Sequence, residues 1–555
     1  MSILLDFMRV LWYNFLMKTQ QNPLENLHKI NEELRAENEQ LRQTVQWLME
    51  QLKLSKHQRF GPSSEQTPLD QLSIGELVHC FNEAEAVADL SAPEPEITEV
   101  KAHTRKKTRL TTDKLPEDLP VEEVVYELPE DERDCPDCGN EMHKMGQETR
   151  DELKFVPAQA VIIRHIRYVY GCRDCEDNSD HVPIVKADMP EPVIKGGFAS
   201  PEAIAHIATQ KYFMASPLYR QEQEWEQNGI SLSRQTMANW LIKASELWLE
   251  PVYEAMKARL LKREVLHADE TTNQVLHEPG KTAQSKSYMW LYRTSGDAEH
   301  PIVLYEYKPS RKHSHPKEFL KDFSGFLHAD GYDGYHALPE NITVVGCWAH
   351  LRRKFTDVLK TVPKENWAET DAGKGVAYCD KLFHLEKQFS SLTPNERLKE
   401  RERLSKPLID EFYKWIDSLK AVPQMLLGKA RHYAQSQRKY LVRYLLDGRL
   451  EISNNRAERS IKPFVIGRKN WLFCNTVRGA KSSAVYYSLI VTARENGLNP
   501  YEYLSWLLTN APNLGKPGYI TKNENFLPGS PAIPDKVYSP KQLGSKPEAL
   551  AWAED

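Results

Sequence analysis

The sequence predicts a multidomain α/β protein with a coiled coil, a zinc-ribbon-like module, a helix-turn-helix, and a mixed-sheet domain that holds a helical insertion. Three observations predict it: a seven-residue leucine repeat near the N-terminus, two Cys-x-x-Cys pairs, and strand signals alternating with helical ones in the C-terminal half. A chain of 555 residues is too long for one core, so several folded units are expected.

The expected order of units follows from shifts in periodicity and composition. It is a coiled coil (leucine zipper) over 22–57, a linker over 58–112, a zinc-binding module over 113–190, a helix-turn-helix region over 191–255, a sheet domain over 256–357 and 448–510, a helical insertion over 358–447, and a tail over 511–555.

The composition is that of an ordinary globular protein. The net charge of −5 does not by itself indicate whether the protein binds a polyanion. The basic residues cluster locally, with seven Lys or Arg against one Glu between Arg456 and Lys481. The apolar start, Ile3–Met17, is too short to span a bilayer and lacks the features of a signal peptide, so no membrane partner is expected. Met17 is an alternative start of translation.

The coiled coil is predicted from an apolar repeat of seven residues. Such a repeat keeps one stripe of a helix facing a partner helix. The stripe consists of Leu27, Leu34, Leu41 and Leu48, with Leu24, Asn31, Asn38, Val45 and Leu52 on the other seam. Pro23 suits the start of this helix. We expect a homodimer or a higher oligomer; the alternative is an amphipathic helix packed on its own chain.

Two cysteine pairs predict a structural metal site. Cys135 with Cys138 and Cys172 with Cys175 flank a strand-like segment, Ala160–Tyr170. Four thiolates in tetrahedral reach suit Zn²⁺ and leave no open position for catalysis. This use of cysteine indicates a reducing cytoplasm. His181 is an alternative ligand, although a surface histidine is the simpler interpretation.

A helix-turn-helix is predicted in the middle of the chain. Pro217–Gln227 has a helical pattern, Asn228 and Gly229 form a turn, and serines 231 and 233 offer caps for a second helix reaching Ala244. In this motif the second helix enters the major groove of DNA. Its exposed side would present Arg234, Gln235 and Asn239 to base edges. The alternative is an ordinary helical pair.

Five strand signals follow in an informative order. They are Val265–Asp269, Ser287–Arg293, Ile302–Tyr307, Gly325–Asp330 and Thr343–Cys347, with a helix over His315–Phe323 and a short helix before the fifth strand. Three strands in a meander followed by two with helical crossovers describe an RNase-H-like mixed sheet.

Three acids occupy positions where such a sheet would bring them together. Asp269 is expected to end the first strand and Asp330 the fourth, which is its parallel neighbour, while Glu458 arrives on a later helix. Carboxylate oxygens suit two Mg²⁺ (or Mn²⁺) ions that stabilise the attacking and leaving oxygens of a phosphodiester. Asp333, three residues after Asp330, is the alternative second acid.

At these residues the chain resembles the insertion-sequence-66 family of DDE transposases. The resemblance covers most of residues 24–508 and includes the zipper, Arg59-Phe60-Gly61, the cysteine pairs, His267-Ala268-Asp269-Glu270-Thr271, Asp330-Gly331-Tyr332, Gly346 to Phe355, Asn454 to Arg459, and Gly467 to Phe473. It implies a DNA transposase whose catalytic acids Asp269, Asp330 and Glu458 cleave DNA strands and transfer them.

The resemblance also implies double-stranded DNA, as transposon ends and target, and small accessory transposition proteins as partners. Basic residues would contact DNA phosphates: Arg352, Arg353, Arg456, Arg459, Lys462, Arg468 and Lys469. The helical insertion is expected to contact transposon-end DNA, with a purely structural role as the alternative. Cys347-x2-His350 resembles a signature that follows the second acid in several DDE families, and we interpret it as packing beside the site.

One departure from the family is expected at the C-terminus, because proline-rich Pro512–Asp555 is not clearly like the family's conserved tail. Two rival functions remain: a non-catalytic DNA-binding regulator, which explains only the first 250 residues, and a metal-dependent nuclease without strand transfer. The expected location is the bacterial cytoplasm, in association with the nucleoid.

The cysteine pairs predict one tightly bound zinc ion per chain. Because structural thiolate sites couple metal binding to folding, Cys172→Ser should lose the zinc and unfold that module. Elemental analysis of anaerobically purified protein checks the stoichiometry. Wild-type protein that contains no zinc would contradict the prediction.

Overall fold

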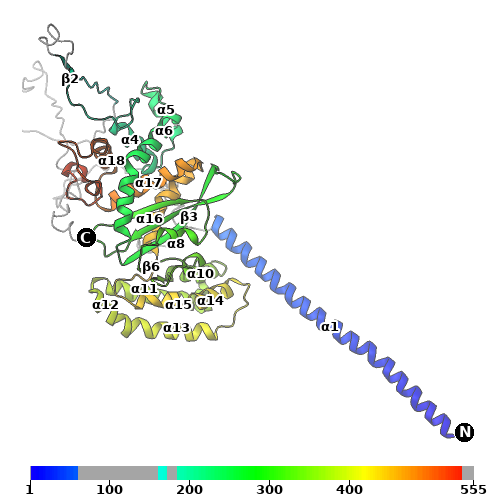
Figure 1. Ribbon diagram of the computed structural model, residues 1–555. Coiled ribbons are helices and arrows are strands. Elements are labelled where there is room, and N and C mark those ends of the chain that lie inside the picture. The colour runs from blue at the N-terminus through cyan, green and yellow to red at the C-terminus, as the bar shows by residue number, and fades with distance from the viewer. Residues whose placement is uncertain (1, 61–159, 172–183, 540–555) are drawn as a thin grey trace, which may run out of the picture. The chain divides into compact units, whose positions relative to one another are not determined.

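The computed structural model describes residues 2–60, 160–171 and 184–539 of the chain (Figure 1). Helix α1 covers Ser2–Phe60. Among the helices in these ranges, none combines the length and apolar character of a membrane-spanning segment.

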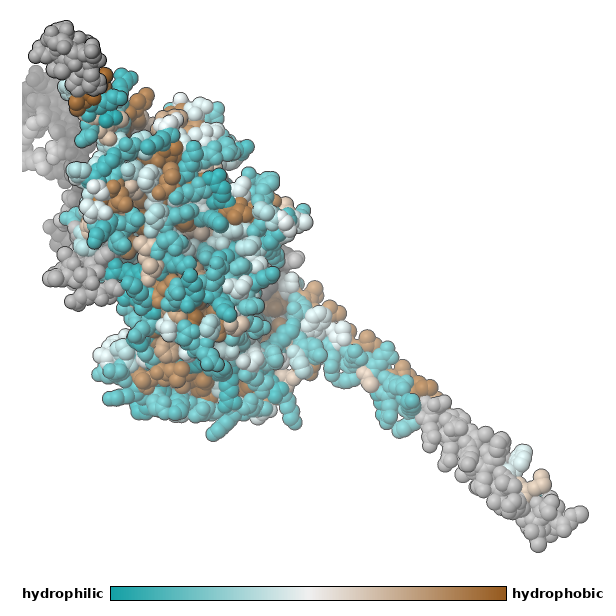
Figure 2. All heavy atoms as spheres, in the orientation of Figure 1, coloured by the Kyte–Doolittle hydropathy of each residue, from teal (hydrophilic) through white to brown (hydrophobic). Residues whose placement is uncertain are grey.

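In α1 the predicted leucine stripe is exposed, at Leu27, Leu34, Leu41 and Leu48. Figure 2 shows apolar residues following one edge of the described part of this helix. Such a stripe is available for a partner helix, and the pairing itself stays a prediction. The expected helix start at Pro23 is wrong, because α1 begins at Ser2 and continues through that proline. A proline removes one backbone hydrogen bond, but it does not compel a helix to begin there.

The four cysteines predicted to bind zinc lie outside the described residues. Next to them, β1 (Val169–Gly171) and β2 (Ile184–Lys186) form a two-stranded sheet. The strand predicted over Ala160–Tyr170 is therefore confined to its C-terminal end. The apolar side chains before it, such as Val161 and Ile162, are exposed, so alternation alone was not sufficient to extend the strand.

Four helical segments lead into the main sheet: α4 (Pro201–Tyr212), α5 (Leu218–Gln227), α6 (Arg234–Ala244) with the π-helical segment 245–249, and α7 (Glu250–Leu260). The expected pair of helices is present as α5 and α6. Gly229 supplies the positive φ of 77° that their tight turn requires, and Ser233 caps α6 by accepting from the Thr236 N–H at 3.1 Å.

The main sheet has the order β5-β4-β3-β6-β7. Its strands are β3 (Val265–His277), β4 (Lys286–Thr294), β5 (Val303–Lys308), β6 (Gly325–His328) and β7 (Ile342–Val345), with α8 (Ser314–Phe319) and α9 (Asp333–His336) in the crossovers. The first three strands are antiparallel neighbours, whereas β3, β6 and β7 are parallel.

The expected end of the first strand at Asp269 is wrong. β3 runs on to His277, because its distal half pairs with β4 and, in parallel, with β8 (Cys474–Thr476). That second pairing joins residues about 200 positions apart, which no local sequence pattern reveals. Asp269 therefore lies inside a long strand, beyond the point where β6 ends at His328.

Helices cover the sheet and share one core with it. These are α16 (Asn455–Trp471), which packs on β3 and β4, α17 (Val477–Glu495), which packs on β5, and α18 (Pro500–Asn510), which packs on α4. Residues of the predicted tail, including Phe526, Ile533 and Val537, are buried in the same core. Up to residue 539 this tail is thus part of the folded domain.

The helical insertion forms a second core (Figure 1). The helices around this core are α10 (Trp348–Leu359), most of which precedes the predicted insertion, and, within the insertion, α11 (Asp371–Gln388), α12 (Pro394–Glu400), α13 (Lys406–Ser418), α14 (Leu426–Ser436) and α15 (Arg438–Leu441). Trp348 and Phe412 pack edge to face at 5.4 Å in this core, where Val265 and Val345 of the sheet join them.

A strained turn ends α16. Leu472 has φ 65° and ψ −47°, and the Phe473 N–H donates to the Trp471 carbonyl at 2.8 Å. These are the features of a classic γ-turn, a conformation that L residues rarely adopt. Such a backbone costs on the order of 1–3 kcal/mol.

We predict that Leu472→Gly stabilises the protein by about 1 kcal/mol, because glycine adopts a positive φ without steric cost. Leu472 is 64% exposed, so few contacts are lost. The matched control is Leu446→Gly, at an exposed leucine with φ −78°, where glycine should destabilise by about the same amount. Urea unfolding of both variants checks the two signs, and a destabilised Leu472→Gly would contradict the strain.

Candidate active site

Strand register brings two aspartates to one edge of the sheet. His267 of β3 pairs with His328 of the parallel strand β6, and each begins a His-Ala-Asp sequence. The two imidazoles are fully buried and stack at 4.4 Å. Because side chains alternate along a strand, residues two positions later return to the same face. Asp269 and Asp330 therefore emerge side by side beyond the carboxyl end of β6.

Asp330 and Asp333 lie in different surroundings. The Asp330 carboxylate accepts the Tyr332 N–H at 2.9 Å. Asp333 lies in the first turn of α9 with a side chain that is 97% exposed, 3.6 Å from His336. Of these two acids, Asp330 is the one close to Asp269.

Glu458 joins the aspartates from the first turn of α16, where it is 2% exposed. The start of this helix is fastened to β3 by Asn454, which is itself buried. The Asn454 amide donates to the Ala268 carbonyl at 2.7 Å, and its oxygen lies 3.0 Å from His267 Nδ1. Asn454 thus hydrogen-bonds to both His267 and Ala268, the residues before Asp269, and thereby positions the helix turn that carries Glu458.

Helix α10 surrounds the Glu458 carboxylate with three side chains. Arg353 donates to Oε2 at 3.2 Å, and His350 Nδ1 lies 3.6 Å from Oε1. Cys347, His350 and Glu458 offer sulfur, nitrogen and oxygen atoms within 4.8 Å of one another. The Cys-x2-His motif therefore lies beside the site, and Glu458 adds a third potential metal ligand to it, so its interpretation as packing alone stays a prediction.

The electrostatics of the cluster are those of acids forced together. Burial raises the pKa of Asp269 well above its ordinary value, and the neighbouring Glu270, Asp330 and Glu458 raise it further. Burial and Asp330 likewise raise the pKa of Glu270. Raised carboxyl pKa values indicate that this site would gain free energy by binding a cation.

The donor set fits hard divalent cations. Carboxylate oxygens are the ligands that Mg²⁺ and Mn²⁺ prefer, and several are gathered here from β3, the loop after β6, and α16. Two buried polar atoms, Glu458 Oε1 and His350 Nδ1, have no hydrogen-bond partner among the residues that the structure describes. Unpaired buried polar atoms are costly, and an ion would relieve that cost.

Glu270 was not predicted to be a site residue, although it lies in the motif His267-Ala268-Asp269-Glu270-Thr271. Its carboxylate accepts from Arg311 Nε at 2.7 Å and from the Tyr335 hydroxyl at 2.6 Å. Asn454 was missed in the same way. Both residues are adjacent in sequence to recognised motifs, but their roles depend on contacts with distant segments.

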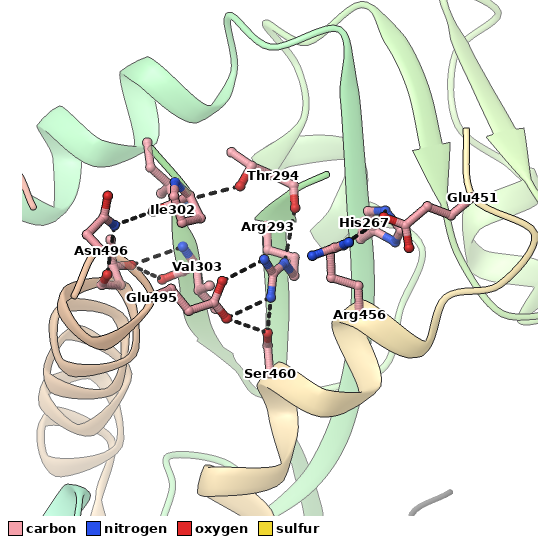
Figure 3. Close-up of polar contacts among 12 residues, drawn as sticks. His267, Arg293, Thr294, Ile302, Val303, Glu451, Arg456, Ser460, Glu495 and Asn496 are labelled. Atoms are coloured by element: carbon pink, nitrogen blue, oxygen red, sulfur yellow. Dashed lines mark hydrogen bonds and ion pairs between the residues drawn. The ribbon is translucent and has the colours of Figure 1, made fainter. Parts of the chain in front are cut away.

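An ion pair between buried Arg293 and partly exposed Glu495 holds α16 against the sheet (Figure 3). Arg293 of β4 donates to both carboxylate oxygens of Glu495 in α17, at 2.8 and 2.7 Å, and to the Ser460 hydroxyl of α16. Nearby, Arg456 donates to Glu451 at 2.7 Å, and Glu451 lies 3.8 Å from His267 (Figure 3). The helix bearing Glu458 is thus held on two sides.

The expected DNA-contacting residues fall into two groups. Arg234, Gln235 and Asn239 are exposed on α6, and Arg459 and Lys469 are exposed on α16. The remaining residues are half-buried and contact the protein: Arg352 with Asp380 at 2.6 Å, Arg353 with Glu458, Arg456 with Glu451, Lys462 with an intramolecular partner, and Arg468 with Thr271 at 3.2 Å. The residues of this half-buried group therefore stabilise the fold, whatever further contact they make with DNA. Contacts also occur in the exposed group, where Arg234 lies 3.9 Å from Glu222 and Gln235 donates to Asn239 at 3.3 Å.

Four family models match this chain. They are described as the transposase IS66 family, over residues 196–482, the zinc-finger binding domain of transposase IS66, over 132–176, Transposase C of IS166 homeodomain, over 47–124, and the IS66 C-terminal element, over 488–517. The last match shows that the family's C-terminal element is present and reaches residue 517, which corrects the expected departure over 512–517.

Similar proteins occur in Sinorhizobium fredii. The uncharacterized protein y4hP is 31% identical over 488 residues, which are 82% of this chain and 85% of that protein. The uncharacterized proteins y4jD and y4qI are 31% and 32% identical over 71% and 70% of this chain, and 77% and 72% of their own lengths. The similarity therefore extends through both cores.

We predict that Asp269→Asn stabilises the metal-free protein at pH 7. Since its pKa is raised on folding, the folded chain retains a proton that the unfolded chain releases above about pH 4. Wild-type stability should then fall as pH rises through this window, by at most about 1.4 kcal/mol per unit, and the variant should lack this fall.

Urea unfolding in EDTA between pH 4 and 8 measures this difference, which should vanish near pH 4. Asp322→Asn is the control, since it removes a carboxylate that is 69% exposed and lies outside the cluster, and this variant should keep the wild-type fall in stability as pH rises. If wild type and Asp269→Asn show the same pH dependence, the acids are not coupled as described.

Proposed function

This chain belongs to the IS66 transposase family, and from that premise we propose that it cuts and rejoins DNA with two metal ions held by Asp269, Asp330 and Glu458. The observation that supports this proposal is the convergence of these acids at one edge of the sheet. They come from positions up to 189 residues apart (458 − 269) and meet where Asn454 joins α16 to β3.

The sheet topology supports an RNase-H-like catalytic domain. Three antiparallel strands followed by two parallel ones, in the order β5-β4-β3-β6-β7, match the arrangement expected from the sequence. In that arrangement the first and fourth strands are adjacent and parallel, which is the relation of β3 to β6.

In the proposed reaction, water attacks a phosphodiester at the end of the element, which frees a 3′-hydroxyl on the element and leaves a 5′-phosphate on the flanking strand. That 3′-hydroxyl then attacks a phosphodiester of the target DNA, forms a new ester bond to its phosphorus and releases a target 3′-hydroxyl. Mg²⁺ or Mn²⁺ ions, when bound, stabilise the charge on the attacking and leaving oxygens. Asp269 and Asp330 supply oxygens from the sheet edge, and Glu458 supplies another from α16. Arg353 orients the Glu458 carboxylate, and Arg293, paired with Glu495, holds that helix in place through Ser460.

Other parts of the chain would recognise DNA and partner molecules. We assign end recognition to the zinc module at Cys135, Cys138, Cys172 and Cys175, with structural Zn²⁺, and to the exposed face of α6. Self-association would use the leucine stripe of α1. Small accessory transposition proteins remain proposed partners. The proposed location is the bacterial cytoplasm, in association with the nucleoid.

The rival function is a nuclease that cleaves without joining. It would use every acid named here, so the site geometry does not separate the two. The family supports joining, and a non-catalytic regulator has no need for a cluster of buried acids with raised pKa values.

We predict that Asp269→Asn, Asp330→Asn and Glu458→Gln each reduce end cleavage and joining at least about a thousandfold. Each loses a metal-holding charge worth several kcal/mol in the transition state. Binding to transposon ends should stay within about threefold of wild type, because end recognition is assigned elsewhere. Cleavage and joining of labelled element ends in Mg²⁺, with gel-shift binding, measure both effects.

Asp333→Asn is the matched control and should keep wild-type activity. If only Asp333→Asn is inactive, the second acid is misassigned; if all four variants are active, the catalytic site lies elsewhere. A wild-type protein that cleaves ends but yields no joined product would indicate the nuclease.

A further inference from the structure

A loop that carries none of the three catalytic acids contacts residues next to both aspartates. The Glu270 N–H donates to the Asp269 carboxylate at 2.8 Å, and the Tyr332 N–H donates to the Asp330 carboxylate at 2.9 Å. Between Glu270 and Tyr332 lies Arg311, in the loop that joins β5 to α8. Arg311 contacts both residues, so a continuous chain of contacts runs from one aspartate to the other.

Glu270 fixes one side of the Arg311 guanidinium. The Glu270 side chain is only 1% exposed, and its second oxygen is occupied by the Tyr335 hydroxyl at 2.6 Å. Its first oxygen accepts from Arg311 Nε at 2.7 Å and also from Nη2. A charge-assisted contact of this kind, made to a buried acid, defines the orientation of the planar guanidinium.

Tyr332 fixes the other side. The guanidinium carbon of Arg311 lies 3.9 Å above the Tyr332 ring, and the Tyr332 hydroxyl donates to the Arg311 carbonyl. Both the head group and the backbone of Arg311 are therefore held. Yet its side chain is 41% exposed, so an ordered cation is presented to solvent beside the acids.

Neutralising Glu270 does not account for this arrangement. An arginine whose only role is structural can be buried almost completely, as Arg293 is, at 4% exposed, in its ion pair with Glu495. Arg311 instead keeps its Nη1 edge without a hydrogen-bond partner among the described residues. The negative charge of Asp330 also acts on Arg311 and, with that of Glu270, raises its pKa, so the cation lies within electrostatic range of the cluster.

We infer that Arg311 is a phosphate-binding residue of the active site, which contacts the DNA backbone at or next to the phosphodiester being cut. Glu270 and Tyr332 are its positioning residues. The ligand chemistry follows from the planar guanidinium, whose fork of N–H donors matches phosphate oxygens. A polyanion approaching several carboxylates also requires cations that are fixed in advance. This inference rests on the proposed function and adds a residue outside the triad.

The test replaces Arg311 and, separately, single phosphates of the DNA. In single-turnover cleavage of labelled element ends in Mg²⁺, Arg311→Ala of the full-length protein should be slower by at least about tenfold. A neutral methylphosphonate is then placed at each position around the cut. At one position it should slow wild type by a similar factor and slow Arg311→Ala hardly further, because the contact is already lost.

Lys312→Ala is the matched control. This lysine is exposed in the same loop, and its side chain makes no hydrogen bond or ion pair with the described residues. It should leave both the rate and the methylphosphonate profile unchanged. Glu270→Gln should reproduce the Arg311→Ala profile at the same phosphate, which a merely structural role for Glu270 would not do. Melting temperatures of the variants establish that they are folded.

The outcomes distinguish failure of the proposed function from failure of the role assigned to Arg311. Wild-type protein that cleaves no ends would overturn the proposed function, and this inference with it. Wild type that cleaves while Arg311→Ala matches its rate would overturn the inference alone. The same holds if methylphosphonates slow Arg311→Ala as much as wild type at every position, since no phosphate would then be coupled to Arg311.

Discussion

Repulsion among carboxylates at the carboxyl edge of β3 and β6 is the constraint that the rest of the structure has to satisfy. Burial and the negative charges of Glu270, Asp330 and Glu458 raise the pKa of Asp269, and burial and Asp330 raise that of Glu270. The fold therefore has to supply free energy to keep these acids together. It does so with parallel pairing in a fixed register, and with backbone N–H groups aimed at both aspartates. The same repulsion makes the site attractive to cations, so strain and function have one origin.

Holding α16 is the second requirement, because its first turn brings an acid into that repulsive field. Asn454 fastens the start of the helix to β3, and the Arg293 pair fastens its middle to β4 and α17. The γ-turn at Leu472 then reverses the chain so that β8 can pair with the far end of β3. Distant parts of the sequence thus converge on one helix.

The sequence was sufficient to predict the order of strands, the helical pair α5 and α6, and the acids that now lie together. These features depend on local patterns of period two and 3.6, and on motifs within short segments. It was insufficient for the length of β3, the start of α1, and the roles of Glu270 and Asn454. The length of β3 depends on pairing with β8, about 200 residues away. The roles of Glu270 and Asn454 depend on contacts that only the folded chain makes. The zinc ligands lie outside the described residues, so that prediction stands as made.

The helical insertion has a consequence for how copies of such a gene interact. It lies between the second acid and the third, so 128 positions (458 − 330) separate them. A gene copy with a premature stop codon inside the insertion would encode α6 and both aspartates, but not Glu458 or the strands and helices that complete its core. Under the proposed function, such a fragment could occupy DNA ends without cutting them. Damaged copies would then restrain the intact ones, and decay of the element would limit its own spread.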